Sequence, residues 1–187
     1  MKIAVYSGSF NPLHIGHLAI MKHLTQEAGF DMVYLIVSPK NPLKEGISSA
    51  SGHERYEAAV AAVNRHFPTT SKVKVDDIEL NMPEPHYTVR TLNALKVREP
   101  GNDFTFVMGA DNLADIRRWR EYVTILKDFG VAVFPRIGYD LPQIKQDLLR
   151  EDSAYLIQIL DATLVNISST EIRNAQSIGE DISKYLM

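Results

Sequence analysis

Two histidines, His14 and His17, stand three residues apart where an apolar run passes into a helical pattern. Gly8 and Gly16 flank them in the stretch SGSFNPLHIGH, the first permitting a tight turn and the second letting a helix begin without a Cβ in the way. A helix N-terminus offers unpaired N–H groups and a positive dipole end, which suit phosphate, and imidazoles add donors there. The stretch matches neither G-x-G-x-x-G nor the P-loop pattern. It predicts a phosphate site of a different type.

Zinc is the alternative ligand for a His-x-x-His pair. A zinc site needs further ligands, and this chain contains no cysteine, so a partner has to come from elsewhere in the sequence. Metal analysis of protein purified without chelator distinguishes the two interpretations.

A second group of anion-binding residue types lies near the other end, in ISSTEIRNA, residues 167–175. Ser168 and Glu171 form an S-x-x-E capping box, which predicts that a helix starts here. Its first turn carries Ser169, Thr170 and Arg173, whose hydroxyls and guanidinium can converge on an anion. An ordinary capped helix is the alternative. Two such helix ends in one chain point to a polyphosphate.

Composition limits the classes of protein to consider. The chain has 187 residues with 45% hydrophobic and 23% charged residues, which favours one globular domain over residues 1–187. A formal charge of −3 provides no basic field for nucleic acid, and the absence of cysteine excludes disulfides and thiolate chemistry. The first residues do not form a signal peptide, and no apolar run is long enough to span a bilayer. We expect a cytoplasmic protein without membrane or nucleic-acid partners, and leave a homo-oligomer open.

The elements that must position these residues alternate along the chain. Strands are predicted at 2–7, 32–38, 72–80, 104–109, 131–136 and 155–160. Helices are predicted at 17–28, 89–98, 112–128, 142–151 and 169–176. A further helix, with apolar residues from Tyr56 to Phe67, is predicted to follow a capping box formed by Ser51 and Glu54. This alternation predicts an α/β fold, a Rossmann-like doubly wound parallel sheet with helices on both faces. Ligands then bind beyond the carboxyl ends of the strands. The Pro-, Gly- and Ser-rich loops 39–52 and 81–87 are candidate binding loops.

GSFNPLHIGH and ISSTEIR resemble the HxGH signature and the C-terminal companion motif of the nucleotidyltransferase superfamily. Four further stretches resemble the bacterial nicotinate-nucleotide adenylyltransferase family. They are SPKNPLK with Lys44, PHYTVRTL with Tyr87 and Thr88, FVMGADNLADIRRW with Gly109, Asp111 and Trp119, and VFPR with Arg136. The resemblance extends from residue 1 to about residue 185, so it covers nearly the whole chain.

The resemblance implies adenylyl transfer from ATP to nicotinic acid mononucleotide, with Mg²⁺ carried mostly by ATP and no protein ligand named for the metal. The implied catalytic residues are His14, His17 and Arg173. The implied ATP site comprises Gly8, Ser9, Phe10, His14, His17, Gly109, Asp111, Ser168, Ser169, Thr170 and Arg173. The implied mononucleotide site comprises Asn11, Lys44, Tyr87, Thr88, Trp119 and Arg136. The attacking phosphate monoester has a second pKa of about 6, so this chemistry needs no general base.

Several alternatives stay open. Asn11 stands where the family commonly has aspartate, which leaves a nicotinamide-mononucleotide enzyme as an alternative. A sister enzyme such as phosphopantetheine adenylyltransferase, and a non-catalytic nucleotide sensor, are two others. Trp119 could be a core residue, Asp111 a helix N-cap and Arg136 a structural partner of an acid. The chain ends at SKYLM, where relatives usually continue into a short helix, so we expect some loss of stability.

Overall fold

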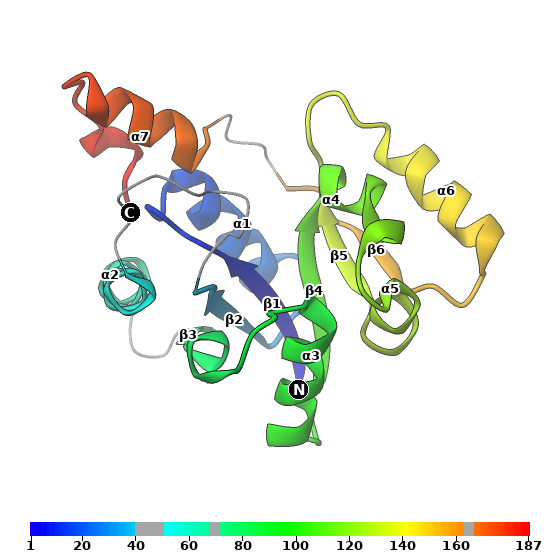
Figure 1. Cartoon of the computed structure of the whole chain (residues 1–187). Coiled ribbons are helices and arrows are strands. Elements are labelled where there is room, and N and C mark those ends of the chain that lie inside the picture. The colour runs from blue at the N-terminus through cyan, green and yellow to red at the C-terminus, as the bar shows by residue number, and fades with distance from the viewer. Residues whose placement is uncertain (40–50, 68–71, 163–166) are drawn as a thin grey trace.

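The structure is a computed structural model that describes residues 1–39, 51–67, 72–162 and 167–187 (Figure 1). Its centre is a six-stranded sheet of order β3-β2-β1-β4-β5-β6, in which every neighbouring pair is parallel. The strands are β1 (Lys2–Gly8), β2 (Met32–Val37), β3 (Val73–Asp76), β4 (Asp103–Gly109), β5 (Val131–Phe134) and β6 (Ile157–Ile159). The predicted parallel α/β sheet is therefore confirmed.

Helices connect successive strands. The longer ones are α1 (Ile15–Gln26), α2 (Gly52–His66), α3 (Thr88–Arg98), α6 (Leu141–Glu151) and α7 (Ser169–Ser177). The shorter ones are η1 (Ile78–Asn81), α4 (Ala110–Ala114), η2 (Ile116–Arg118), α5 (Tyr122–Thr124), the π-helical turn η3 (Ile125–Phe129) and η4 (Ser183–Tyr185). Among helices of the described residues, none combines the length and apolar character needed to cross a membrane.

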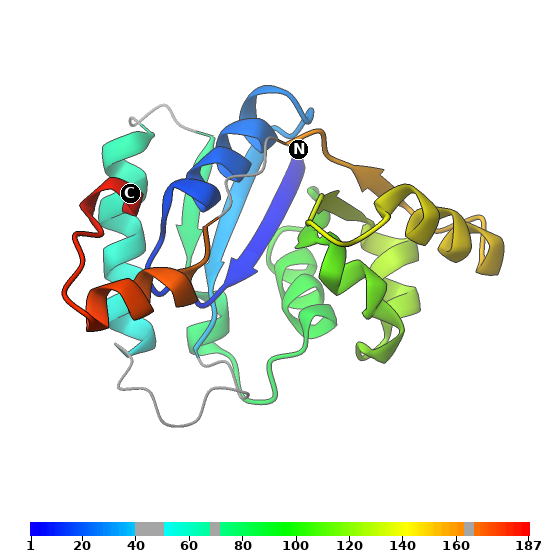
Figure 2. The same cartoon turned by 90° about the horizontal axis from the view of Figure 1, so that it is seen from above.

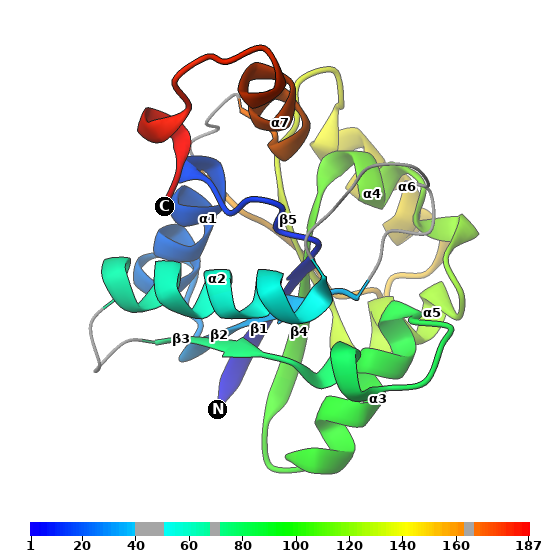
Figure 3. The ribbon, with the colours of Figure 1, turned by 60° about the vertical axis from the view of Figure 1, so that its left-hand side comes forward.

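The sheet separates two apolar clusters because side chains alternate along each strand. In β1, Ile3 and Val5 pack with α3, α4 and α6, whereas Ala4 and Tyr6 pack with α1 and α2 on the opposite face. Figures 2 and 3 show α1 and α2 together on one side of the sheet and α3 on the other. The helices thus cover both faces, as predicted.

The strand order places a topological switch between β1 and β4. From there the chain winds outward to β3 in one direction and to β6 in the other. Both central strands end in glycine, with Gly8 in register with Val37 and Gly109 with Phe134. A parallel sheet binds ligands in the crevice outside such a switch point. The turn that carries the two histidines starts from this edge.

Two predicted elements are wrong in extent. Strand 72–80 stops at Asp76, because its carboxylate accepts the Ile78 N–H (3.1 Å) and pairs with Arg98 (2.7 Å), which turns the chain into η1. Helix 112–128 is broken into α4, η2, α5 and η3. The break includes Glu121 in the left-handed region (φ 52°), and it separates the buried Ile116 from the buried Ile125. In a continuous helix nine positions make about two and a half turns and would put these isoleucines on opposite faces, whereas here both pack into the same cluster.

Candidate active site

His14 and His17 lock each other into place at the start of α1. The Gly16 N–H donates to His14 Nδ1 (3.1 Å) and the His14 N–H donates to His17 Nδ1 (3.2 Å), which forms a capping box made of imidazoles. The rings stack with centroids 3.7 Å apart. A Cβ at Gly16 would lie 3.0 Å from the His14 ring, so a side chain at this position would press against the imidazole. Because both Nδ1 atoms accept, the remaining ring proton of each neutral histidine sits on Nε2.

The surroundings keep both imidazoles neutral. Burial, and then the positive charge of Arg136, lower the pKa of His14 to about 4 despite the opposing charge of Glu171. Burial, His14 and Arg136 hold the pKa of His17 well below its ordinary value. Near pH 7 the pair thus offers Nε2–H donors rather than positive charges. No group of three His, Asp or Glu side chains in the described part of the chain could hold a metal ion.

The turn between β1 and α1 is held by the ring of Phe10. Phe10 has a positive φ of 43° and is buried, and its ring meets the rings of Tyr6 and His17 edge-on. A Cβ at Gly8 would approach the Phe10 ring to 3.1 Å. The close approach of the Phe10 ring to Gly8 agrees with the prediction that glycine permits a tight turn here.

Helix α7 docks onto the same turn, although it lies at the other end of the sequence. The Ser169 hydroxyl donates to the Pro12 carbonyl (3.0 Å), and Arg173 Nη1 donates to the Asn11 carbonyl (2.6 Å). Arg173 Nη2 donates to the Thr170 hydroxyl (3.0 Å), while Ser168 is the N-cap of α7, as predicted. Figures 1 and 2 show the start of α7 beside the start of α1. The two predicted anion-binding helix ends are therefore neighbours.

A third group of predicted site residues, Gly109, Asp111 and Arg136, lies at the end of β4. A Cβ at Gly109 would clash with the Asp111 carboxylate and lie 3.1 Å from Arg136 Nε and from the Phe134 ring. Asp111 is the second residue of α4 rather than its N-cap, and its Oδ1, buried and without a hydrogen bond in the described structure, lies 3.7 Å from Arg136 Nε. The Arg136 guanidinium lies over Phe134, 5.0 Å from the ring centroid. The Phe134 ring meets the Tyr6 ring (centroids 6.3 Å apart), and Tyr6 also meets the ring of His17, so this group adjoins the histidine turn.

Tyr87, Thr88 and Trp119 line one cavity of about 200 Å³. Thr88 is the first residue of α3, and Tyr87 is 45% exposed. The half-buried Trp119 packs edge-on against Phe106 with centroids 5.9 Å apart, so it serves the core and also borders the cavity. Lys44 lies outside the described residues, and its role stays a prediction.

Sequence reasoning missed four side chains. His86, Arg118 and Arg120 complete the lining of the cavity, and the two arginines lie where the predicted helix 112–128 is interrupted. Arg55 is 6% exposed, and its guanidinium donates to the carbonyls of Ser9 (2.6 Å), Ser38 (2.8 Å) and Pro39 (2.6 Å). The burial of Arg55 could have been predicted from the sequence, because Arg55 stands four positions before the buried Ala59 and so lies on the same face of α2.

Comparisons with known proteins agree with this geometry. A family model described as cytidylyltransferase-like matches residues 5–175. A "probable nicotinate-nucleotide adenylyltransferase" of Flavobacterium johnsoniae is 37% identical over 186 residues, which cover 100% of this chain and 92% of the relative. One of Flavobacterium psychrophilum is 38% identical, covering 92% of this chain and 85% of the relative.

The fold also has a close structural match. The nicotinic acid mononucleotide adenylyltransferase of Plasmodium falciparum, complexed with NaAD, superimposes with a TM-score of 0.77 at 22% identity, covering 99% of this chain and 90% of that one. At that identity the likeness supports the fold alone. The family match and the full-length relatives carry the assignment: this chain belongs to the cytidylyltransferase-like family.

Proposed function

We propose that this chain is a nicotinate-nucleotide adenylyltransferase, which joins nicotinic acid mononucleotide to the adenylyl group of ATP and releases pyrophosphate. The observation that carries the proposal is the pair of locked, neutral histidines facing a docked helix end that bears an arginine. Relatives with the corresponding name match this chain over its whole length. That match favours this reaction over those of sister transferases.

The chemistry requires positioning more than proton transfer. A phosphate oxygen of the mononucleotide attacks the α-phosphorus of ATP, and the bond from that phosphorus to the oxygen bridging to the β-phosphate breaks. The attacking monoester has a second pKa of about 6, so it is largely ionised at neutral pH and needs no base. What the protein adds is alignment of the two anions and donors for the charge that develops around the α-phosphorus. The fixed Nε2–H groups of His14 and His17 suit that role.

The remaining predicted residues divide among three tasks. Thr170, Arg173 and the N-terminal turn of α7 bind the triphosphate, whereas the Ser169 hydroxyl anchors α7 to the turn at Pro12. Asp111 and Arg136 lie together beside Gly109 at the end of β4, and we assign them to the ribose and phosphate groups of the substrates. The full ATP site and the mononucleotide site given by the resemblance, including Asn11, stay predictions that substrate-bound structures or variants must test.

Magnesium enters this scheme with the substrate, as the Mg²⁺ complex of ATP. Oxygen ligands from the triphosphate and water satisfy this ion, so the protein need not supply a cage. A cytoplasmic location, a single domain and a homo-oligomer remain predictions.

The test is a product assay with Mg²⁺-ATP and either nicotinic acid mononucleotide or nicotinamide mononucleotide. We expect pyrophosphate and dinucleotide in equal amounts, with the acid strongly preferred. Absence of pyrophosphate with both substrates would overturn the proposal, and equal turnover of the two would move the enzyme to the nicotinamide branch. A third reaction with phosphopantetheine tests the sister enzyme.

Variants then locate the chemistry. His17→Ala removes one donor and should lower kcat by about 10²-fold or more, the effect typical of losing a preorganised donor. His53→Gln is the matched control, because His53 is exposed on α2 and contacts only Glu57 among the ion pairs of the described residues. Unchanged kcat in His17→Ala would remove the histidine pair from the mechanism.

A further inference from the structure

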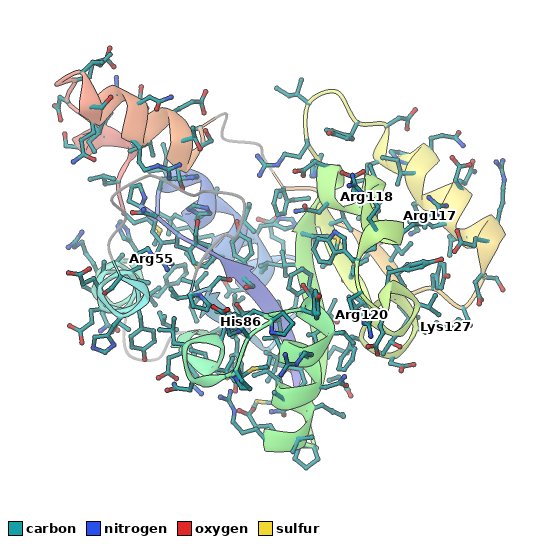
Figure 4. The ribbon with its side chains drawn as sticks, viewed as in Figure 1. Arg55, His86, Arg117, Arg118, Arg120 and Lys127 are labelled. Carbon is teal, nitrogen blue, oxygen red and sulfur yellow. The ribbon has the colours of Figure 1, made fainter. Side chains whose placement is uncertain are left out.

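The cavity beside Trp119 has a cationic wall. Arg118 and Arg120 line it together with His86, Tyr87 and Thr88, and among the described residues no acidic side chain belongs to the lining. Figure 4 shows His86 on the α3 side and the two arginines on the segment between α4 and α5. An aromatic ring bordered by two guanidinium groups suits a flat ligand that carries a negative charge.

Within the described structure, the two arginines have few partners that would hold them away from the cavity. Arg120 has one ion pair there, a 3.7 Å contact with the exposed Glu121, and the Arg118 side chain has neither an ion pair nor a hydrogen bond. Their neighbour Arg117 differs, because its Nε donates to Glu151 (2.8 Å) on α6. Of the three arginines in the stretch 117–120, the one paired with Glu151 lies toward α6 (Figure 4), and the two others border the cavity.

The opposite wall adds positive potential of its own. Helix α3 begins at Thr88, and no side chain in the described residues caps its N-terminus at Tyr87. The first amides of a helix are unpaired donors at the positive end of the dipole. His86 contributes a buried Nδ1 that has no hydrogen-bond partner in the described structure. Both walls thus favour an anion in the cavity.

We propose that Arg118 and Arg120 are specificity-determining residues that select a pyridine mononucleotide with a ring carboxylate over the isosteric carboxamide. The inference rests on the proposed function, since it assumes that the pyridine ring lies against Trp119. An arginine strengthens binding of a carboxylate through a charge-assisted hydrogen bond that a neutral carboxamide does not match. On this inference, the asparagine at position 11, where the family commonly has aspartate, does not determine whether the enzyme prefers the acid or the amide substrate.

The test compares kcat/KM for the acid and the amide at saturating Mg²⁺-ATP. The variants are Arg118→Gln, Arg120→Gln and the double variant, with Arg117→Gln as the matched control. We expect the acid-to-amide ratio to fall about tenfold in each single variant and further in the double variant, with the larger loss on the acid. Arg117→Gln should leave the ratio unchanged, since Arg117 is held by Glu151.

Two further measurements separate charge from packing. Arg118→Lys and Arg120→Lys keep the charge and should retain most of the ratio. Trp119 is the sole tryptophan of the chain, so its fluorescence reports mononucleotide binding without turnover. The dissociation constant of the acid should rise about tenfold in each glutamine variant. Tm values of the variants should match that of the parent because both arginines are exposed.

The outcomes distinguish this inference from the proposed function. If the parent enzyme turns over neither mononucleotide, or prefers the amide, the proposed function fails. If the parent prefers the acid and the double variant keeps the same ratio and the same dissociation constant, the enzyme assignment stands and the inference about Arg118 and Arg120 is overturned.

Discussion

Replacing Arg55 with methionine should cost more stability than replacing any other arginine of α2. The guanidinium connects the turn after β1, through the Ser9 carbonyl, to the end of β2, through the Ser38 and Pro39 carbonyls. Methionine fills a similar volume but donates no hydrogen bond. Three carbonyls at the crevice then lose a charged donor.

The magnitude follows from these three contacts. A hydrogen bond to a charged group contributes about 1.5–3 kcal/mol, and an unsatisfied buried acceptor costs about 1–3 kcal/mol. Water can reach part of the vacated site, because Ser38 and Pro39 are only partly buried. We therefore expect a loss of about 3–4 kcal/mol in the free energy of unfolding. For a chain of 187 residues this corresponds to a Tm lower by about 10 °C.

The assay is urea unfolding and thermal unfolding of Arg55→Met beside Arg65→Met. Arg65 lies on the same helix and is exposed. Among the described residues its side chain makes one hydrogen bond, from Nη1 to the backbone oxygen of Met187 (2.9 Å), so its replacement should cost less than about 1 kcal/mol. Arg55→Met should also lower kcat, because the Ser9 carbonyl belongs to the turn that leads to the histidines. If the two variants unfold within about 3 °C of each other, the reasoning about buried donors is wrong.

Three other predictions concern single positions. Gly109→Ala should lower kcat/KM by about tenfold or more with a small change in Tm, because the new Cβ displaces Asp111 and Arg136; a fully active variant would contradict this. The folded-state pKa of His14, about 4, lies below the ordinary 6.5, so its contribution to stability is present above pH 6.5 and is lost as pH falls through 4. His14→Asn keeps an N-cap but does not titrate, so the free energy of unfolding in urea should differ less between pH 7.5 and pH 4.5 than it does in the parent; an equal difference in both proteins would refute this. Asp76→Asn should destabilise the fold by about 2–3 kcal/mol, because the bonds from Arg98 at 3.0 and 2.7 Å weaken; a midpoint equal to the parent's would show that the pair contributes little.

The sequence by itself determined the features that depend on local hydrogen bonding and on the periodicity of apolar residues. The S-x-x-E boxes at Ser51 and Ser168 predicted helix starts correctly, since capping involves residues three positions apart. The alternation of apolar runs with helical patterns predicted the parallel sheet, because that connectivity leaves few other topologies. Glycine at positions 8 and 16 was also readable as a device for close packing, since Gly8 ends β1 at the turn and Gly16 lies in the first turn of α1.

Tertiary structure alone decided which distant residues meet. Arg173 reaches the Asn11 carbonyl across 162 positions of sequence, and the cavity forms where residues 86–88 face residues 118–120. Helical periodicity did not predict the break near Glu121, because the break depends on packing: Ile125 is buried in the core, while the chain leaves the helical conformation at Glu121. Arg55 illustrates the same limit: its position on the buried face was predictable, but its three carbonyl partners depend on how β1 and β2 end side by side. Contacts of this kind arise from packing, which no local pattern encodes.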